Sequence, residues 1–275
     1  MHNRARRPFS AAGDAPLAVT WLGHATALIE LGGTRVLTDP ILRNRVGPLR
    51  RIGAAPNRVL LDDIDAVVVS HLHADHADPA SLRMIGAARV LAPRGSRRWL
   101  AKRGVAHVEE LAVGEQTKLD GAKLRATMAS HDARRWPLGP AAPPIGFVVE
   151  ASQSRQSCYF AGDTALSPGM AELAGRIDLA LLPVWGWGRD VGPGHLDPVT
   201  AARAARLIAP RVVVPIHWGT LAPAWRLGRI EDASLPARRF AELVGLEAPE
   251  VDARVLAPGQ RTELAPRPPA TVEPA

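Results

Sequence analysis

The stretch at residues 70–78, which reads Ser-His-Leu-His-Ala-Asp-His-Ala-Asp, constrains this chain more than any other. It packs three histidines and one aspartate into six positions, and these are His71, His73, Asp75 and His76. The apolar run 66–69 that precedes it is typical of a buried strand. Imidazole and carboxylate groups are ligands of zinc and related transition metals, and buried ring nitrogens without a partner would be costly. The stretch therefore predicts a metal site at a strand end, with a histidine-rich surface loop as the alternative.

Residues of the same chemical types recur where later apolar runs end. His131 follows the run 123–130, Asp163 follows 157–161 within Gly-Asp-Thr, and His217 follows 211–216. Five of the nine histidines lie at such strand ends, while His24 and His195 lie in glycine-flanked loops. Because ligands from separate strand ends meet at one edge of a sheet, we expect these side chains to converge.

Turn and cap signals divide the rest of the chain into the elements of an α/β domain. Strands are expected at 17–22, 25–31, 34–39, 65–70, 89–92, 107–111, 117–119, 123–130, 145–151, 157–161, 177–183, 211–216 and, last, 253–256. Helices are expected at 79–87, 96–103, from 168, from 198 to before Pro210, and at 235–244. Gly32 and Gly33 predict a hairpin turn, and 43–58 is expected to be an irregular loop.

Composition limits the classes of protein that fit. The formal charge is +7, but nine arginines and only three acidic residues lie in the first 60 residues, so the remainder is nearly neutral and a nucleic-acid-coating surface is disfavoured. We find no apolar stretch of membrane-spanning length and no apolar signal core after the arginines of the leader, which favours a cytoplasmic protein. The expected organisation is a disordered basic leader at 1–16, one domain at 17–264 and a proline-rich disordered tail at 265–275.

The motif His-X-His-X-Asp-His, followed in order by His131, Asp163 and His217, resembles the metallo-β-lactamase superfamily. The resemblance runs from about residue 19 to 220 and implies an αββα sandwich, in which two facing mixed β-sheets carry helices on their outer faces. It also implies two divalent metal ions. One would be held by His71, His73, His131 and Asp163, and the other by Asp75, His76, His217 and again Asp163 as the bridge. Ligand type favours Zn²⁺, with Mn²⁺ or iron as alternatives.

Finer features look like the branch that contains N-acylphosphatidylethanolamine-hydrolysing phospholipase D and the ascorbate-6-phosphate lactonase-like proteins. The motifs that carry this likeness are Trp-Leu-Gly-His-Ala-Thr at 21–26, Leu-Thr-Asp-Pro at 37–40, Gly-Pro-Leu-Arg at 47–50, His-Leu-Asp-Pro at 195–198 and Ile-His-Trp-Gly-Thr at 216–220. The loop 185–194 has no counterpart in that pattern, so lipid specificity is not carried over.

Several residues are candidates for roles beside metal binding. Asp75 is expected to orient or deprotonate the water nucleophile, and His195 to protonate the leaving group, grip an anionic substrate or simply pack on a loop tryptophan. Asp39 either holds a ligand histidine or is a turn aspartate, and His24 either lines the pocket or satisfies a tight turn. Trp185 and Trp187 are candidates for the pocket wall. Arg50 is a candidate anion clamp, together with Arg51, Arg134, Arg135 and Arg189, although most of these are expected to be solvated.

The function expected from this set is that of a dinuclear metal-dependent hydrolase, because two adjacent cations activate a bridging water. The expected substrate is a phosphodiester or a phospholipid-like, anionic small molecule. Hydrolysis of a lactone or ester is the nearest alternative. A nucleic-acid-processing enzyme and a non-catalytic metal-binding scaffold are alternatives of other classes.

Overall fold

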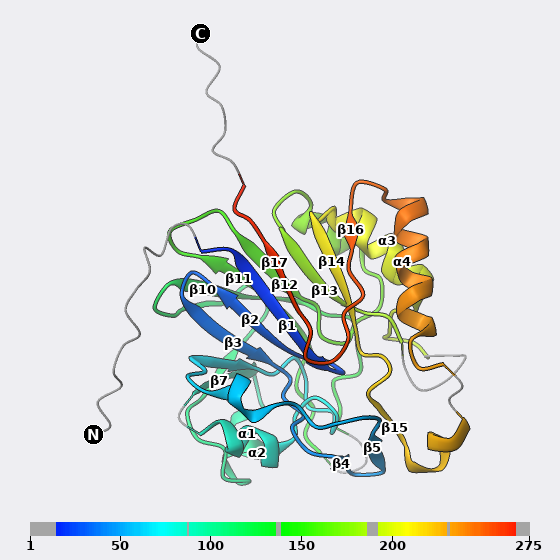
Figure 1. Ribbon diagram of the computed structural model, residues 1–275. Coiled ribbons are helices and arrows are strands. Elements are labelled where there is room, and N and C mark those ends of the chain that lie inside the picture. The colour runs from blue at the N-terminus through cyan, green and yellow to red at the C-terminus, as the bar shows by residue number, and fades with distance from the viewer. Residues whose placement is uncertain (1–14, 87, 136–138, 186–191, 230–231, 268–275) are drawn as a thin grey trace.

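The computed structural model describes residues 15–86, 88–135, 139–185, 192–229 and 232–267, and all structural statements below concern these residues. They form two facing seven-stranded mixed sheets with helices on the outside, so the predicted αββα sandwich is confirmed (Figure 1). The first sheet has the order β17-β1-β2-β3-β6-β7-β8. Its strands are β1 (Leu17–Gly23), β2 (Thr26–Leu31), β3 (Thr34–Thr38), β6 (Ala66–Val68), β7 (Arg89–Pro93), β8 (Val108–Leu111) and β17 (Arg261–Leu264).

The second sheet has the order β16-β14-β13-β12-β11-β10-β9. Its strands are β9 (Gln116–Lys118), β10 (Ala122–Met128), β11 (Ile145–Ala151), β12 (Ser157–Phe160), β13 (Leu179–Pro183), β14 (Val212–Ile216) and β16 (Asp252–Ala253). Strands β9 to β12 pair antiparallel, whereas β12, β13, β14 and β16 pair parallel. Their nearly continuous apolar composition suits a sheet that is covered on both faces.

Strand β6 contributes side chains to the apolar layers on both faces of the first sheet. Ala66 and Val68 face the layer between the sheets, whereas Val67 and Val69 face the outer layer beneath α1 (Pro79–Ile85) and α2 (Arg97–Ala101). This division follows from the period of two of a β-strand. On the other sheet, α3 (Pro198–Ile208) contacts β13 and α4 (Leu235–Glu247) contacts β14.

The predicted helix starts at aspartate–proline pairs are confirmed. The Asp78 carboxylate accepts a hydrogen bond from the Ser81 amide at the start of α1, and Asp197 forms a capping box with Thr200 at the start of α3. The helix expected from residue 168 is instead a 3₁₀ helix, η2 (Pro168–Leu173). The Gly32–Gly33 hairpin between β2 and β3 is confirmed, with positive φ at both glycines.

Two expectations were wrong. Part of 43–58, expected to be an irregular loop, forms β4 (Arg45–Val46) and β5 (Leu49–Arg51), which join β15 (Leu221–Pro223) in a third, three-stranded sheet. The strand expected to be last, near 253–256, is followed by β17, which pairs antiparallel with β1. Residues 224–229 also form a 3₁₀ helix, η3 (Ala224–Arg229), and 58–61 form η1 (Arg58–Leu61). Sequence patterns missed these pieces because they are short and carry arginine and proline.

The predicted leader and tail lie almost wholly outside the described residues, which begin at residue 15 and end at residue 267. No described helix combines the length and the apolar character that crossing a bilayer requires.

Candidate metal centre

The candidate residues follow strands that run in the same direction within their sheet. In the first sheet, β1, β3 and β6 are codirectional, and the loops after them begin with His24, Asp39 and the stretch 70–78. In the second sheet, β10, β12 and β14 are codirectional and are followed by His131, Asp163 and His217. Because both sheets present these strand ends to one edge of the sandwich, seven separate loops meet there, including the loop after β13 that carries His195.

A network centred on Asp39 fixes the rings of two histidines. The Ser70 amide donates to Asp39 Oδ1 at 2.7 Å, the Ser70 hydroxyl donates to Oδ2 at 2.5 Å, and His76 Nδ1 donates to the same Oδ2 at 2.7 Å. Since the Ser70 hydroxyl proton is used on Asp39, its oxygen accepts from His71 Nδ1 at 2.9 Å. In both histidines Nδ1 is therefore held by the network and Nε2 points away from it, so Nε2 is the nitrogen that a metal ion could bind.

Backbone carbonyls orient the other three histidines, each by a hydrogen bond to one ring nitrogen. His131 Nδ1 donates to the Gly194 carbonyl at 2.7 Å, and His217 Nδ1 donates to the Trp185 carbonyl at 2.6 Å. His73 is reversed, because its Nε2 donates to the Arg134 carbonyl at 3.0 Å and leaves Nδ1 for the centre. Each ring thus has one nitrogen held by a neighbour and one nitrogen available to a cation.

The available nitrogens approach one another at distances that only a proton or a metal ion between them would favour. His73 Nδ1 lies 3.0 Å from His131 Nε2, and His76 Nε2 lies 3.2 Å from His217 Nε2. Two ligands bound to one zinc ion at 2.0–2.1 Å lie roughly 3.3 Å apart in tetrahedral geometry. His71 Nε2 and Asp163 Oδ1 are buried without a hydrogen-bond partner. These features fit a metal-binding site better than a hydrogen-bonded polar cluster.

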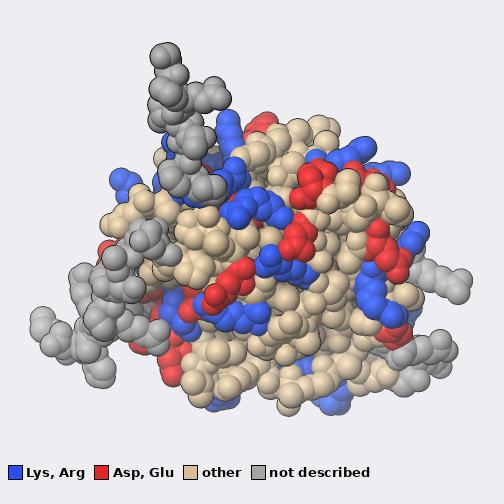
Figure 2. All heavy atoms as spheres, turned by 45° about the horizontal axis from the view of Figure 1, so that its top comes forward, with Lys and Arg blue, Asp and Glu red and all other residues tan. Residues whose placement is uncertain are grey.

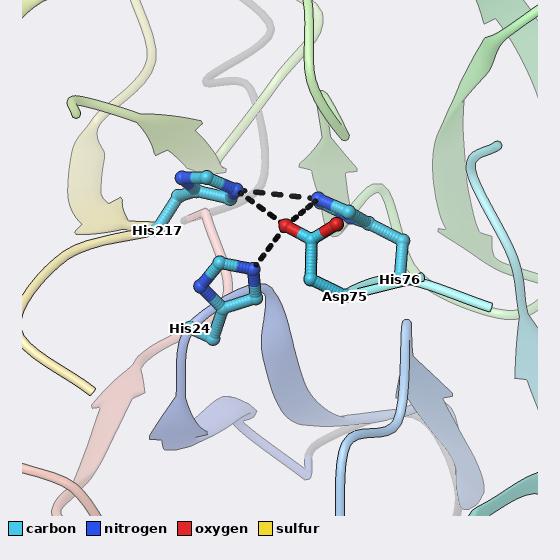
Figure 3. A group of neighbouring side chains, drawn as sticks. All are labelled: His24, Asp75, His76 and His217. Carbon is cyan, nitrogen blue, oxygen red and sulfur yellow. Dashed lines mark hydrogen bonds and ion pairs between the residues drawn. The ribbon is translucent and has the colours of Figure 1, made fainter. Parts of the chain in front are cut away.

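Both carboxylates lie close to the His76–His217 pair. Asp163 Oδ2 is 3.3 Å from the Nε2 atoms of both histidines, and Asp75 Oδ2 is 3.5 and 3.6 Å from the same two atoms. Figure 3 shows the Asp75, His76 and His217 side chains pointing toward one another, with His24 completing the group. A second group joins His71, His73 and His131, and a third joins Asp163 with His131 and His195. Asp163 therefore lies between the two sets that the sequence predicted for the two ions.

Three non-glycine residues of the centre have left-handed backbone conformations. The φ angles are 55° at His24, 31° at Asp39 and 63° at His217. Such conformations cost about 1–3 kcal/mol each and persist where the surrounding structure imposes them. Their concentration at one place, directly after β1, β3 and β14, indicates that the fold holds these side chains in position at some cost in stability.

The electrostatics of the centre separate its histidines into two classes. Burial lowers the pKa of His71 well below its usual value and that of His131 to about 4. Burial acts in the same direction on His76 and His217, but the Asp163 and Asp75 carboxylates outweigh it and raise the pKa of both. Burial raises the pKa of Asp75 and Asp163, but the neighbouring His76 and His217 outweigh it and hold the pKa of both carboxyls well below the usual range.

Other candidates are placed at different depths around this centre. His195 is half-buried, with Nε2 3.7 Å from Asp163 Oδ2 and its ring 4.6 Å from that of His131. Trp185 is half-buried and contributes its carbonyl, while Trp187 and Arg189 lie outside the described residues. Arg50 is exposed, and its neighbour Arg51 is the buried one, donating to the Ile41 carbonyl.

Arg135 has a role that sequence reasoning missed. Its guanidinium donates to the carbonyls of Leu72 and Ala77 and stacks 4.3 Å over the ring of Trp99. It therefore ties together the two ends of the ligand stretch 70–78. The arginine-rich composition hid it, because no local pattern distinguishes this arginine from solvated ones.

The family model described as Beta-lactamase superfamily domain matches residues 34–218. A UPF0173 metal-dependent hydrolase of Methanopyrus kandleri is 32% identical over 254 residues, covering 90% of this chain and 100% of that protein. The structure of Igni18, a metallo hydrolase from Ignicoccus hospitalis, has a TM-score of 0.69 at 23% identity and covers 91% of this chain and 99% of its own. An isothiocyanate hydrolase from Delia radicum gut bacteria has a TM-score of 0.69 at 19% identity, covering 90% and 99%. The two structural likenesses show the shared fold.

Proposed function

The chain belongs to the metallo-β-lactamase superfamily of metal-dependent hydrolases, and we propose that it uses two divalent ions to hydrolyse a phosphodiester or phospholipid-like substrate. The observation that carries the proposal is the convergence of seven side chains, in which each of the five histidines has one ring nitrogen held by a neighbour and the other facing the centre. The proposed hydrolase domain spans 17–264. In support of these bounds, Leu17 of β1 and Leu264 of β17 are paired in the first sheet.

The residues present fit two ions. His71, His73, His131 and Asp163 would hold one, and Asp75, His76, His217 and Asp163 the other, with Zn²⁺ favoured by the histidine-rich donor set and Mn²⁺ or iron as alternatives. When bound, the ions lower the pKa of a water molecule and stabilise the charge that develops on the attacked group.

The protein residues supply orientation and proton transfer. Asp75 retains 8% exposure and an ionised carboxylate, so it is placed to accept the proton of the attacking water. His195 is half-buried beside Asp163, and burial lowers its pKa, so its imidazolium form is a stronger acid that can give its proton to the leaving group and return to neutral imidazole. Arg134 is exposed, and its own carbonyl lies beside His73, so its cation is a candidate partner for an anionic substrate.

The choice of phosphodiester chemistry is supported by the motifs shared with the phospholipase D-like branch and by the nearby arginine. Lactone hydrolysis uses the same ions and remains the alternative. The face seen in Figure 2 adds no support for a nucleic-acid substrate. On the face seen in Figure 2, basic and acidic side chains are interspersed, with ion pairs such as Arg254–Asp252 and Arg261–Glu263 on the described surface.

Turnover of a chromogenic nitrophenyl phosphodiester by zinc-loaded protein, with a simple lactone in parallel, tests this function. We expect the diester to be hydrolysed, chelator-stripped protein to be inactive, and activity to return when metal is added. Lactone hydrolysis alone would replace the phosphodiester proposal with the lactonase one. Absence of both activities in protein that holds its metal would argue for the non-catalytic scaffold.

The affinity of the two ions should respond differently to pH. The ion held by His76 and His217 must displace protons, because the pKa of both is raised and they stay protonated to a higher pH than ordinary histidines. His71 and His131 have lowered pKa values and are already neutral at pH 7. We therefore expect the affinity of the second ion to increase by up to about tenfold per pH unit for each proton displaced, and that of the first to change less. Zinc titrations against a competing chelator at several pH values measure this, and a first ion with the steeper dependence would contradict it.

A further inference from the structure

His24 occupies a turn that the surrounding structure fixes on both sides. Its carbonyl accepts hydrogen bonds from Trp21 Nε1 and from the His217 amide, each at 2.9 Å. Trp21 in turn stacks on Trp218, with ring centroids 4.6 Å apart. The turn therefore ties the end of β1 to the loop after β14, and it places the His24 ring 3.9 Å from the ring of His217.

The ring of His24 is directed at the carboxylate of Asp75, as Figure 3 shows. His24 Nε2 lies 3.0 Å from Asp75 Oδ2, which is a hydrogen-bonding distance. An ionised carboxylate only accepts hydrogen bonds, so the imidazole is the donor. A ring nitrogen that carries this proton has no lone pair for a metal ion.

We propose that His24 is a positioning residue that holds Asp75 in the orientation required to bind the second ion, without binding that ion itself. This inference rests on the metal centre proposed above. It makes His24 the counterpart of Asp39, because Asp39 fixes the candidate ligand His76 and His24 fixes the neighbouring carboxylate of Asp75. Three described histidines lie within 3.0–3.6 Å of Asp75 Oδ2, and His24, which is the nearest of them, is outside the predicted ligand set.

Two amide variants separate this role from its competitors. The Nε2 amide of glutamine reaches about as far from the backbone as the imidazole Nε2, so His24→Gln keeps the donor to Asp75. Asparagine tolerates positive φ better but is too short to reach, so His24→Asn keeps the turn and loses the donor. The readout is the affinity for the second Co²⁺ ion, followed by visible absorption without substrate, with circular dichroism and binding of the first ion as checks of folding.

We expect His24→Asn to lower the affinity for the second Co²⁺ ion by about 10–100-fold. The affinity of His24→Gln should stay within a few-fold of wild type, with an unchanged cobalt spectrum. A weaker second ion in His24→Gln than in His24→Asn would show that His24 serves only the turn, and it would overturn the inference. Equal losses in both variants, with a changed cobalt spectrum, would make His24 a ligand and would also overturn it. If wild-type protein binds no second ion, the proposed centre fails and the inference falls with it.

Discussion

Replacing Asp163 by alanine is expected to empty both metal positions and to reduce hydrolysis to the level of chelator-stripped protein. Asp163 Oδ2 lies 3.3 Å from both His76 and His217, and the same side chain is grouped with His131 on the other side of the centre. It is therefore the one carboxylate shared by the two proposed ligand sets. Its removal also takes away the charge that offsets two ions in a buried site, where uncompensated charge is most costly. Metal analysis after purification without chelator and diester turnover measure the two effects.

Asp178→Ala is the matched control for this variant. Asp178 is also a fully buried aspartate of the second sheet, but it pairs with Arg267 and Arg211 at the opposite ends of the strands. Removing it should lower the free energy of unfolding, because the buried Ser157 amide loses its acceptor and two partly exposed arginines lose their partner, while metal content stays at the wild-type level. Retention of both ions in Asp163→Ala would show that this carboxylate is not the bridge, and metal loss in both variants would mean that general destabilisation is being measured.

Much of the centre could be predicted from sequence because its residues follow strands. A strand signal is local, so the runs before His71, His131 and His217 could be identified without knowing what they pair with. In the second sheet, the parallel order of β12, β13 and β14 brings the ends of these three strands to one edge.

What could not be predicted depends on contacts between distant segments. The carbonyls that orient His73, His131 and His217 belong to Arg134, Gly194 and Trp185, and every residue carries a carbonyl, so sequence cannot mark the ones that matter. Likewise, the small sheet of β4, β5 and β15 and the pairing of β17 with β1 join segments far apart in the chain by very short strands. The side on which His24 meets Asp75 depends on a positive φ that residue type alone does not require.

Asp75→Ala is expected to lose one ion, keep the other and lower diester turnover by at least about 10³-fold, because the variant lacks both a ligand of the second ion and the group placed to accept the proton of water. Its carboxylate faces only the His76–His217 side of the centre, unlike that of Asp163, so the set of His71, His73 and His131 stays complete. Asp75→Ala should therefore lose one ion, whereas Asp163→Ala should lose both. Loss of both ions from Asp75→Ala would mean that the two positions fill only together.

His195→Ala provides the contrast that separates proton transfer from metal binding. His195 lies 3.7 Å from Asp163 and is outside both proposed ligand sets, so this variant should keep both ions while turnover falls by about 10²–10⁴-fold, as expected for loss of a general acid. The loss should be smaller for a substrate with a nitrophenolate leaving group, which departs without a proton, than for one with an alkoxide leaving group. Metal loss from His195→Ala would instead make this histidine a ligand. Equal losses on both substrates would assign it to substrate binding, and Asp75 would then be the only proposed proton-transfer residue at this centre.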